Sequence, residues 1–323
     1  AGPEAGVWVI AETDDLSTKF AKIVVTDDDG RYLLPELPSA TYDLWVRGYG
    51  LVDSEKVSGR PGQELSLRAV LAQTPQDAAQ IYPANYWYSL VEVPDKSEFP
   101  GTGPDGNGIS PAMTSQAVWV DRMKQGCQLC HQLGNRITRE VDHLDEFDSA
   151  VAAWDHRVQT GQRGASMNAG MNRFGRGRGL QMYSEWTERI AAGELPPVPP
   201  RPSGVERNLV LTMWDWGVPT AYIHDEIVTD KRNPRVNANG PVYSVDAGHG
   251  TLVVTNPYEH TSTELTIPVR VEPETIISRF PNAQLEPSYY YGDELLWGVA
   301  PSERSDPHNP MMDAKGRVWM TST

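Results

Sequence analysis

The residues best suited to chemistry lie in one short stretch, the C-x-x-C-H motif of Cys127, Cys130 and His131. Two thiols separated by two residues, followed at once by an imidazole, allow three kinds of chemistry. The thiols can cycle between dithiol and disulfide, the group can bind a metal ion, or the thiols can attach a cofactor through thioethers. The chain has 2 cysteines, so all of its thiol chemistry belongs to this motif.

The surrounding sequence favours cofactor attachment. A redox pair of the thioredoxin type follows a strand in a βαβ unit, and no such unit is evident here. A structural zinc site needs four ligands, and there is no second cysteine pair to supply them. A disulfide across so short a loop is usually strained or reactive. A disulfide or a redox-active cysteine pair stays as the alternative. We predict one covalent haem c, attached at Cys127 and Cys130, with His131 as an axial iron ligand.

The opposite axial ligand is predicted to come from a glycine-rich loop at residues 165–179. Met167 is the first candidate, because a loop thioether raises the reduction potential into an electron-transfer range. Met171 is the second candidate, and His143 and His156 come third. An open coordination site is the remaining alternative.

Arginines gather in the same loop of an otherwise acidic chain, at Arg163, Arg173, Arg176 and Arg178. Because an arginine can bind a carboxylate through two parallel hydrogen bonds, Arg173 and Arg176 are candidates for binding the haem propionates. The alternative is a surface loop whose charges are balanced by Glu185 and Glu188.

Composition limits the classes of partner. The chain of 323 residues carries a net charge of −15, which argues against nucleic acid and anionic membrane surfaces as general partners. No apolar run approaches the roughly 18 residues of a membrane span. The first residues do not resemble a natural start, and haem attachment of this kind takes place outside the bacterial cytoplasm. We therefore expect a processed or trimmed chain from a periplasmic or secreted protein.

Short β-branched or alternating runs predict strands in residues 1–72, at 7–10, 22–25, 42–46 and 65–70. The turn at Asp27 to Gly30, followed by Tyr32, Leu34 and an A-x-Y sequence at 40–42, resembles the carboxypeptidase regulatory-like domain. That resemblance implies a small transthyretin-type β-sandwich with a structural or adhesive role. The aspartates at 27–29 are interpreted as a solvated hairpin turn in preference to a calcium site.

Residues 73–111 are rich in Gly, Pro and aromatic residues, which predicts a linker or a loop packed against a neighbour. Residues 112–217 are predicted to be helical, with helices at 115–124, 144–158, 180–192 and 205–216. A C-x-x-C-H motif, then a helix, a methionine-bearing loop and another helix resembles a class I cytochrome c. The resemblance implies an all-α haem domain that passes electrons to or from a redox partner.

Residues 218–323 return to β structure, with strands predicted at 241–245, 250–255 and 264–270. The sequence at 307–319 resembles the P-H-x-x-x-x-D-x-x-G-x-x-W blade repeat of virginiamycin B lyase-type β-propellers, and that family implies a catalytic role for His308 with magnesium. Because a propeller needs about four to eight blades, we expect either an incomplete propeller or strands that pack elsewhere. The run His224-Asp225-Glu226 is a further candidate for a metal or acid–base site.

The sequence therefore predicts a multidomain α+β protein, with a β-sandwich, a central haem domain and a C-terminal antiparallel β region. The function expected first is electron transfer by a monohaem c-type cytochrome, with a redox protein or a small molecule as donor or acceptor. The alternatives are a haem oxidoreductase with an open iron site and a glycan- or protein-binding module with an auxiliary haem.

Overall fold

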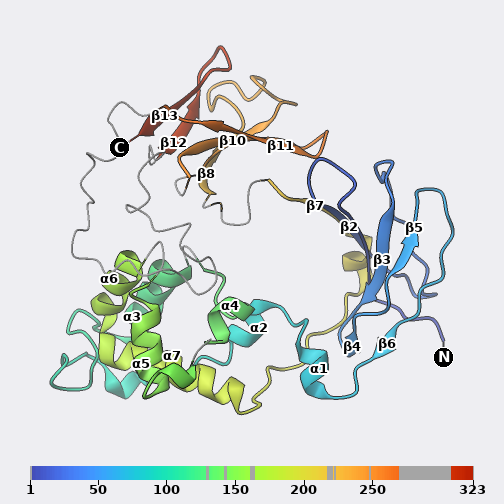
Figure 1. Cartoon of the computed structure of the whole chain (residues 1–323). Coiled ribbons are helices and arrows are strands. Elements are labelled where there is room, and N and C mark those ends of the chain that lie inside the picture. Colours follow the sequence, from blue (N-terminus) through green and yellow to red (C-terminus); the bar gives the residue numbers. More distant parts are fainter. Residues whose placement is uncertain are drawn as a thin grey trace. The chain divides into compact units, whose positions relative to one another are not determined.

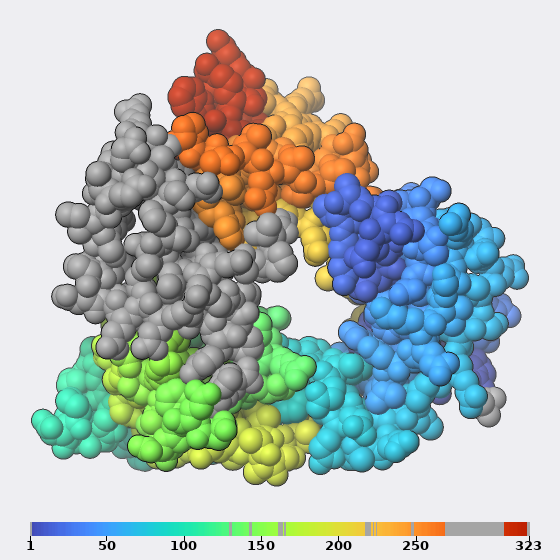
Figure 2. Space-filling model, in the orientation of Figure 1, coloured from blue at the N-terminus to red at the C-terminus, as the bar shows by residue number. Residues whose placement is uncertain are grey.

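The computed structural model describes residues 2–128, 131–141, 144–160, 164–216, 221, 223–246, 249–268 and 307–322. Within these residues the protein is mixed α+β, with antiparallel sheets and a group of helices. They divide into two compact units, one of residues 2–72, 200–268 and 307–322, and the other of residues 73–199. The space-filling view shows the second unit as one continuous body, coloured from cyan to yellow (Figure 2).

Five antiparallel strands form the main sheet of the first unit, in the order β5-β3-β1-β2-β7 (Figure 1). Their bounds are Trp8–Thr13 (β1), Phe20–Val25 (β2), Tyr42–Arg47 (β3), Val57–Gly59 (β5) and Val210–Trp214 (β7). Two shorter strands, β4 (Leu51–Val52) and β6 (Val70–Leu71), pair with each other. The strands predicted at 7–10, 22–25 and 42–46 are confirmed. Of the run at 65–70, only the last residue is in a strand.

Most residues of β1, β2 and β3 are buried or half-buried, because these strands are rich in apolar residues. Ala11, Phe20, Tyr42 and Leu44 form a buried cluster. Leu65 and Leu67 pack against that cluster although their backbone is irregular, so the strand predicted at 65–69 is wrong while its apolar residues still face the core.

The predicted helix at 205–216 is wrong. Residues Gly204–Asn208 form a short 3₁₀ helix (η4), and β7 follows it and pairs with β2. The run Val-Leu-Thr-Met-Trp is rich in β-branched and aromatic residues, and its partner strand lies far away in the sequence. The helical region therefore ends before residue 200, and residues 210–214 complete the edge of the N-terminal sheet.

Two turns of the first unit share one hydrogen-bonding pattern. The Oδ1 atom of Asp27 accepts the backbone N–H groups of Asp29 and Arg31 at 2.9 and 2.8 Å. The Oδ1 atom of Asp313 accepts those of Lys315 and Arg317 at 2.9 and 3.0 Å. A carboxylate that closes its own turn is an Asx-type device, which supports the interpretation of the Asp27 run as a turn. It is not the turn of a β-hairpin, because no strand follows directly and the next strand, β3, pairs with β1 and not with β2.

The C-terminal part of the first unit contains a four-stranded antiparallel sheet in the order β11-β10-β9-β8. Its strands are Ile223–Ile227 (β8), Val242–Asp246 (β9), Thr251–Asn256 (β10) and Thr261–Thr266 (β11). The sequence resembling a blade repeat forms a hairpin of β12 (Pro307–Met312) and β13 (Val318–Ser322). The strands predicted at 241–245 and 250–255 are confirmed. Of the run at 264–270, residues 264–266 belong to β11, residues 267–268 are not in a strand, and residues 269–270 lie outside the described residues.

The second unit is helical (Figure 1). Its α-helices are Pro75–Ala79 (α1), Ala84–Tyr88 (α2), Gln116–Met123 (α3), Arg136–Arg139 (α4), Ala150–Arg157 (α5), Gly164–Phe174 (α6) and Arg176–Ala191 (α7), with 3₁₀ turns at Lys96–Glu98 (η1) and Leu144–Glu146 (η3). Trp119, Met171, Phe174 and Trp186 belong to one buried cluster that joins these helices. The predicted loop at 165–179 is wrong, because residues 164–174 form α6. Two glycines lower its helix propensity, but Met167, Met171 and Phe174 follow helical spacing and pack inward.

The glycine-rich loop after Phe99 packs against the start of α7 and is not a linker between units. Ser110 donates its backbone N–H to the carbonyl of Phe174 at 3.2 Å, and Ile109 is fully buried. Gly175 has a φ of +108°, and a Cβ there would lie 2.4 Å from the carbonyl oxygen of Gly108. The α6–α7 junction therefore holds this loop in place.

Gly179 allows α6 and α7 to pack closely. A Cβ at this position would lie 2.5 Å from Cε2 of Phe174 and 2.7 Å from Sδ of Met171. We expect Gly179→Ala to lower the free energy of unfolding by about 1–3 kcal/mol in urea denaturation, because both buried side chains must move. Gly170→Ala on α6 is the control, since nothing lies within 4 Å of its new Cβ. Equal effects of the two substitutions would contradict this account of the packing.

No helix among the residues described has both the length and the apolar character that a membrane span requires.

Candidate cofactor site

The chemistry-bearing motif begins where α3 changes its hydrogen-bonding pattern. Ser115 caps α3, and its side chain accepts the backbone N–H of Val118. Residues Lys124–Gln128 continue the chain as a single π-helical turn, η2, which carries Cys127. Such turns interrupt helices where a side chain must be redirected, and they recur at functional sites. Cys130 lies outside the described residues, so the structure bears on Cys127 and His131 alone.

Cys127 packs against the main core cluster of the helical unit. The hydroxyl of Tyr183, on α7, donates to its sulfur at 3.5 Å. A second hydroxyl, that of Tyr88, donates to Sδ of Met123 at 3.8 Å, one turn before Cys127. Two sulfur atoms on one side of the α3–η2 segment therefore each accept a hydrogen bond from a tyrosine.

Both tyrosine hydroxyls stay protonated at neutral pH. Burial and the nearby Cys127 raise the pKa of Tyr88 to about 12. Burial is also the main reason why the pKa of Tyr183 lies well above its usual value. Each hydroxyl therefore keeps its proton and can donate a hydrogen bond to the neighbouring sulfur atom. These two hydrogen bonds are polar contacts in otherwise apolar surroundings.

His131 lies four residues after Cys127, and its backbone N–H donates to the carbonyl of Cys127 at 3.0 Å. That bond holds the backbones of the two residues together. Burial and then the positive charge of Arg157 lower the pKa of His131 from its ordinary value. The neutral imidazole, which is the form that binds a metal ion, is thereby favoured.

The segment after His131 is fixed to α2 by Gly134. This residue has a φ of +94°, and a Cβ on it would lie 1.9 Å from the carbonyl oxygen of Ala84. Its N–H donates to Oγ1 of Thr138 at 2.9 Å, and its carbonyl accepts from Arg139 at 2.9 Å. The backbone just beyond the imidazole is therefore tied to two helices, α2 and α4.

The structure places Met167 and Met171 on α6, which packs against η2. Met171 is 3% exposed, and its sulfur is the atom that closely approaches Gly179 on α7. Met167 lies one turn earlier, is only partly buried, and packs against the same core cluster as Cys127. The sulfur of Met171 therefore lies in the contact between α6 and α7, whereas Met167 lies at the edge of the core.

The arginines that were candidates for propionate binding differ in their surroundings. Arg173 is exposed on α6, and no ion pair to it is found within the described part of the chain. Arg176 donates from Nε to Asp155 on α5 at 2.6 Å and also to Asn168 on α6. Arg178 pairs with Glu98 at 3.0 Å. Both ion pairs connect separate segments of the unit, and neither uses Glu185 or Glu188.

Other predicted site residues are distributed over both units. His156, on α5, packs its ring against Phe147 with 5.1 Å between ring centres. His143 and Arg163 lie outside the described residues. In the first unit, Oδ2 of Asp225 accepts the backbone N–H of Asn309 at 2.9 Å and lies 3.7 Å from Nδ1 of His308. These contacts fix β12 to β8, and within the residues described no group of three or more metal-ligating side chains is found.

Tyr183 and Tyr88 are the site residues that sequence reasoning missed. Tyr183 lies on the apolar stripe of α7, and its ring stacks on Trp154 with 5.0 Å between ring centres. The available signal was a hydroxyl in an otherwise apolar stripe, since a buried hydroxyl needs a partner. Nothing in the sequence spacing indicates that this partner is Cys127.

Comparison of the chain with models of protein families, with curated proteins and with solved structures gives no match. The functional argument therefore depends on the chemistry of the site itself. The thioredoxin-type alternative is disfavoured by the local fold, because the motif follows helix α3 and not a strand.

Proposed function

We propose that the protein is a monohaem c-type cytochrome that exchanges electrons with a redox partner, either a protein or a small molecule. The observation that carries the proposal is the C-x-x-C-H spacing, with a backbone hydrogen bond from His131 to Cys127 and with Cys127 packed against an apolar core. A haem at this motif would supply one-electron chemistry at its iron.

The residues described fit such a group. Cys127 lies at the edge of the core, where a thioether could form without burying a charge. Tyr183 holds the sulfur through a hydrogen bond, and His131 is held by the backbone bond to Cys127. Met167 supplies a soft sulfur on the helix that packs against η2, and exposed Arg173 on that helix is the better candidate of the two arginines for a carboxylate. Arg176 serves to position α5, α6 and α7.

The finer assignments of the first unit belong to the same proposal. We propose that its N-terminal sheet is a carboxypeptidase regulatory-like sandwich and that the β8–β11 sheet corresponds to one propeller blade. A four-stranded antiparallel sheet in sequential order is the repeating unit of a propeller, which supports the second assignment. The protein would work in the periplasm or outside the cell, where haem is attached to such motifs.

The test is the mass of the intact protein after denaturation, with the protein made in cells that attach haem c. We expect the mass of one haem to stay with the chain, and we expect it to be lost when Cys127 and Cys130 are both replaced by Ser. A Tyr183→Phe variant is the control, because it removes the hydroxyl and leaves both thiols. A denatured mass equal to the bare polypeptide would overturn the proposal.

A further inference from the structure

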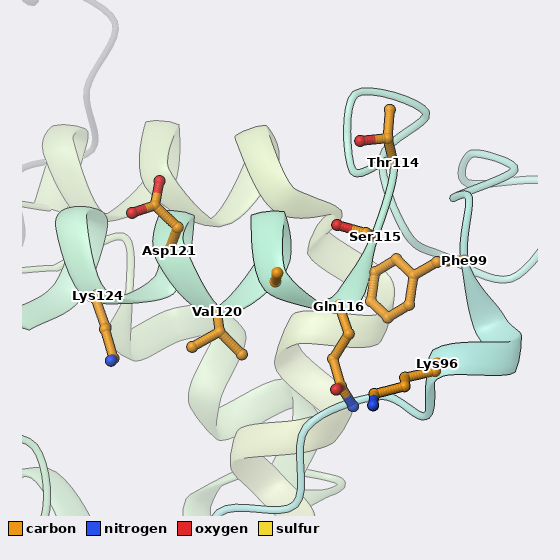
Figure 3. Close-up of a pocket in the computed structure, with 9 residues that line it drawn as sticks. Lys96, Phe99, Thr114, Ser115, Gln116, Val120, Asp121 and Lys124 are labelled. Carbon is orange, nitrogen blue, oxygen red and sulfur yellow. The ribbon is translucent and has the colours of Figure 1, made fainter.

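A cavity of about 620 Å³ lies beside α3 in the helical unit, on a side of the helix that the haem proposal does not use. Figure 3 shows its lining. One wall is the stripe of Gln116, Val120 and Lys124, which are spaced four residues apart on α3 and at its end. Lys96 and Phe99 form the opposite wall. The volume is within the range of small-molecule sites, about 300–1,000 Å³.

The walls are held rigidly by hydrogen bonds. Gln116 donates from Nε2 to the carbonyl of Pro94 at 2.9 Å, which joins α3 to the segment before η1. Asp95 and Glu98 cap η1 reciprocally. The ring of Phe99 meets that of the fully buried Trp119 edge-on, with 6.2 Å between their centres. The cavity is therefore part of the folded unit and does not need a ligand to form it.

The centre of the cavity is apolar and its two ends are cationic. Ala117 and Val120 line the middle, between Gln116 and Lys124, and Figure 3 shows the ring of Phe99 beside Gln116, at the Lys96 end. In Figure 3, Lys96 extends toward Gln116 at one end, and Lys124 extends to the same side of α3 at the other. Eight residues separate Gln116 from Lys124, which corresponds to about 12 Å along a helix.

The acidic residues at or near the cavity already have hydrogen-bonding partners. Asp121 itself lines the cavity, and both its carboxylate oxygens accept from Gln125, at 3.0 and 3.1 Å. Glu98 pairs with Arg178, and Asp95 accepts from Ser97 at the start of η1. In a chain with a net charge of −15, this leaves two cationic ends around an apolar centre.

We propose that this cavity binds an elongated dicarboxylate with an apolar or aromatic middle. One carboxylate would lie against Lys96 and the amide of Gln116, and the other against Lys124. The apolar body would cover Val120 and Phe99, and its burial supplies most of the affinity. The lysines supply selectivity, because a neutral ligand leaves both of them unpaired.

The test uses calorimetry with three probes: a biphenyl dicarboxylate with one acid group at each end, the matching monocarboxylate, and the matching dialcohol. We expect the dicarboxylate to bind most tightly. Lys124→Gln should weaken its binding about three- to fivefold, as expected for one solvent-exposed ion pair. The monocarboxylate should lose at most about twofold, because it can turn round and use Lys96. Val120→Trp should abolish binding of all three probes by filling the middle.

The matched control is Lys231→Gln, which removes an equal charge from an exposed lysine of the other unit. We expect it to leave all three affinities unchanged. Equal binding of the three probes, no binding, or an equal effect of Lys231→Gln and Lys124→Gln would overturn the proposal. Because both lysine side chains are exposed, these substitutions should not affect folding, and a thermal scan checks this. The inference does not depend on the haem, and the same titration can be made with protein that lacks it.

Discussion

Gly134→Ala should cost about 3 kcal/mol or more in the free energy of unfolding. Two independent penalties add at this position. The φ of +94° is a conformation that residues with a side chain rarely adopt, and the new Cβ would approach the carbonyl oxygen of Ala84 to 1.9 Å. The backbone cannot shift freely, because Thr138 and Arg139 bind it from the other side. The chain just after His131 must then leave α2, so we also expect a reduced haem content.

The measurement is denaturant unfolding combined with the haem content of the purified protein. Gly126→Ala is the matched control, because it lies next to Cys127 and nothing lies within 4 Å of its new Cβ. We expect Gly126→Ala to change the free energy of unfolding by less than about 1 kcal/mol. If Gly134→Ala stayed within the same range, the segment after His131 could not be anchored as described.

Replacing Met167 should abolish sulfur ligation of the haem iron. The oxidised protein is expected to show a weak near-infrared sulfur-to-iron band, and Met167→Leu should remove it. The reduction potential should fall as well, because a thioether ligand favours the ferrous state. Leucine is chosen because it nearly conserves the volume of methionine and limits any effect on packing.

Met171→Leu is the corresponding control on α6. It should keep the band, since the sulfur of Met171 faces Gly179, and it should cost less than about 1.5 kcal/mol in stability. Loss of the band in Met171→Leu alone would identify Met171, one turn further along α6, as the ligand. If both variants kept the band, another of the 9 methionines of the chain would be the sulfur ligand, and the assignment to α6 would be wrong. If wild-type protein lacked the band and bound cyanide readily, the open-site alternative would gain support.

Local patterns predicted the elements whose stabilising contacts are close in sequence. Residues 115–124 were predicted as a helix and contain α3, and short β-branched or alternating runs identified β1, β2 and β3. Helix α6 was missed because Gly164 and Gly170 suggest a loop, and its stability comes from packing on η2 and α7. Strand β7 was missed because its hydrogen bonds go to β2, nearly two hundred residues earlier, and no local pattern records that partner.

In the candidate site, too, some features could be predicted from the sequence and others depend on the fold. Covalent attachment needs residues at fixed sequence spacing, so Cys127, Cys130 and His131 could be proposed from the sequence alone. The hydroxyl of Tyr183 on the sulfur of Cys127, and the contact between Gly134 and α2, depend on how helices pack. The difference between Met167 and Met171 is also a packing property, since both occupy one face of α6. The chemistry of the motif could therefore be proposed from the sequence alone, whereas the contacts that position its residues could be identified only from the fold.

The pairing of β7 with the N-terminal sheet bears on how residues 73–199 could have been inserted into the chain and on the order in which the sheet can form during translation. Ala72 donates its N–H to the carbonyl of Gly50 at 3.1 Å, and Arg201 donates from Nε to the carbonyl of the adjacent Tyr49 at 3.0 Å. The points where the chain leaves and re-enters the β unit are thus tethered to neighbouring residues. Residues 73–199 therefore form an insertion whose two ends lie close together. A domain tolerates such an insertion well, because its own backbone hardly needs to change. During translation, β7 cannot complete the N-terminal sheet until residues 73–199 have been synthesised.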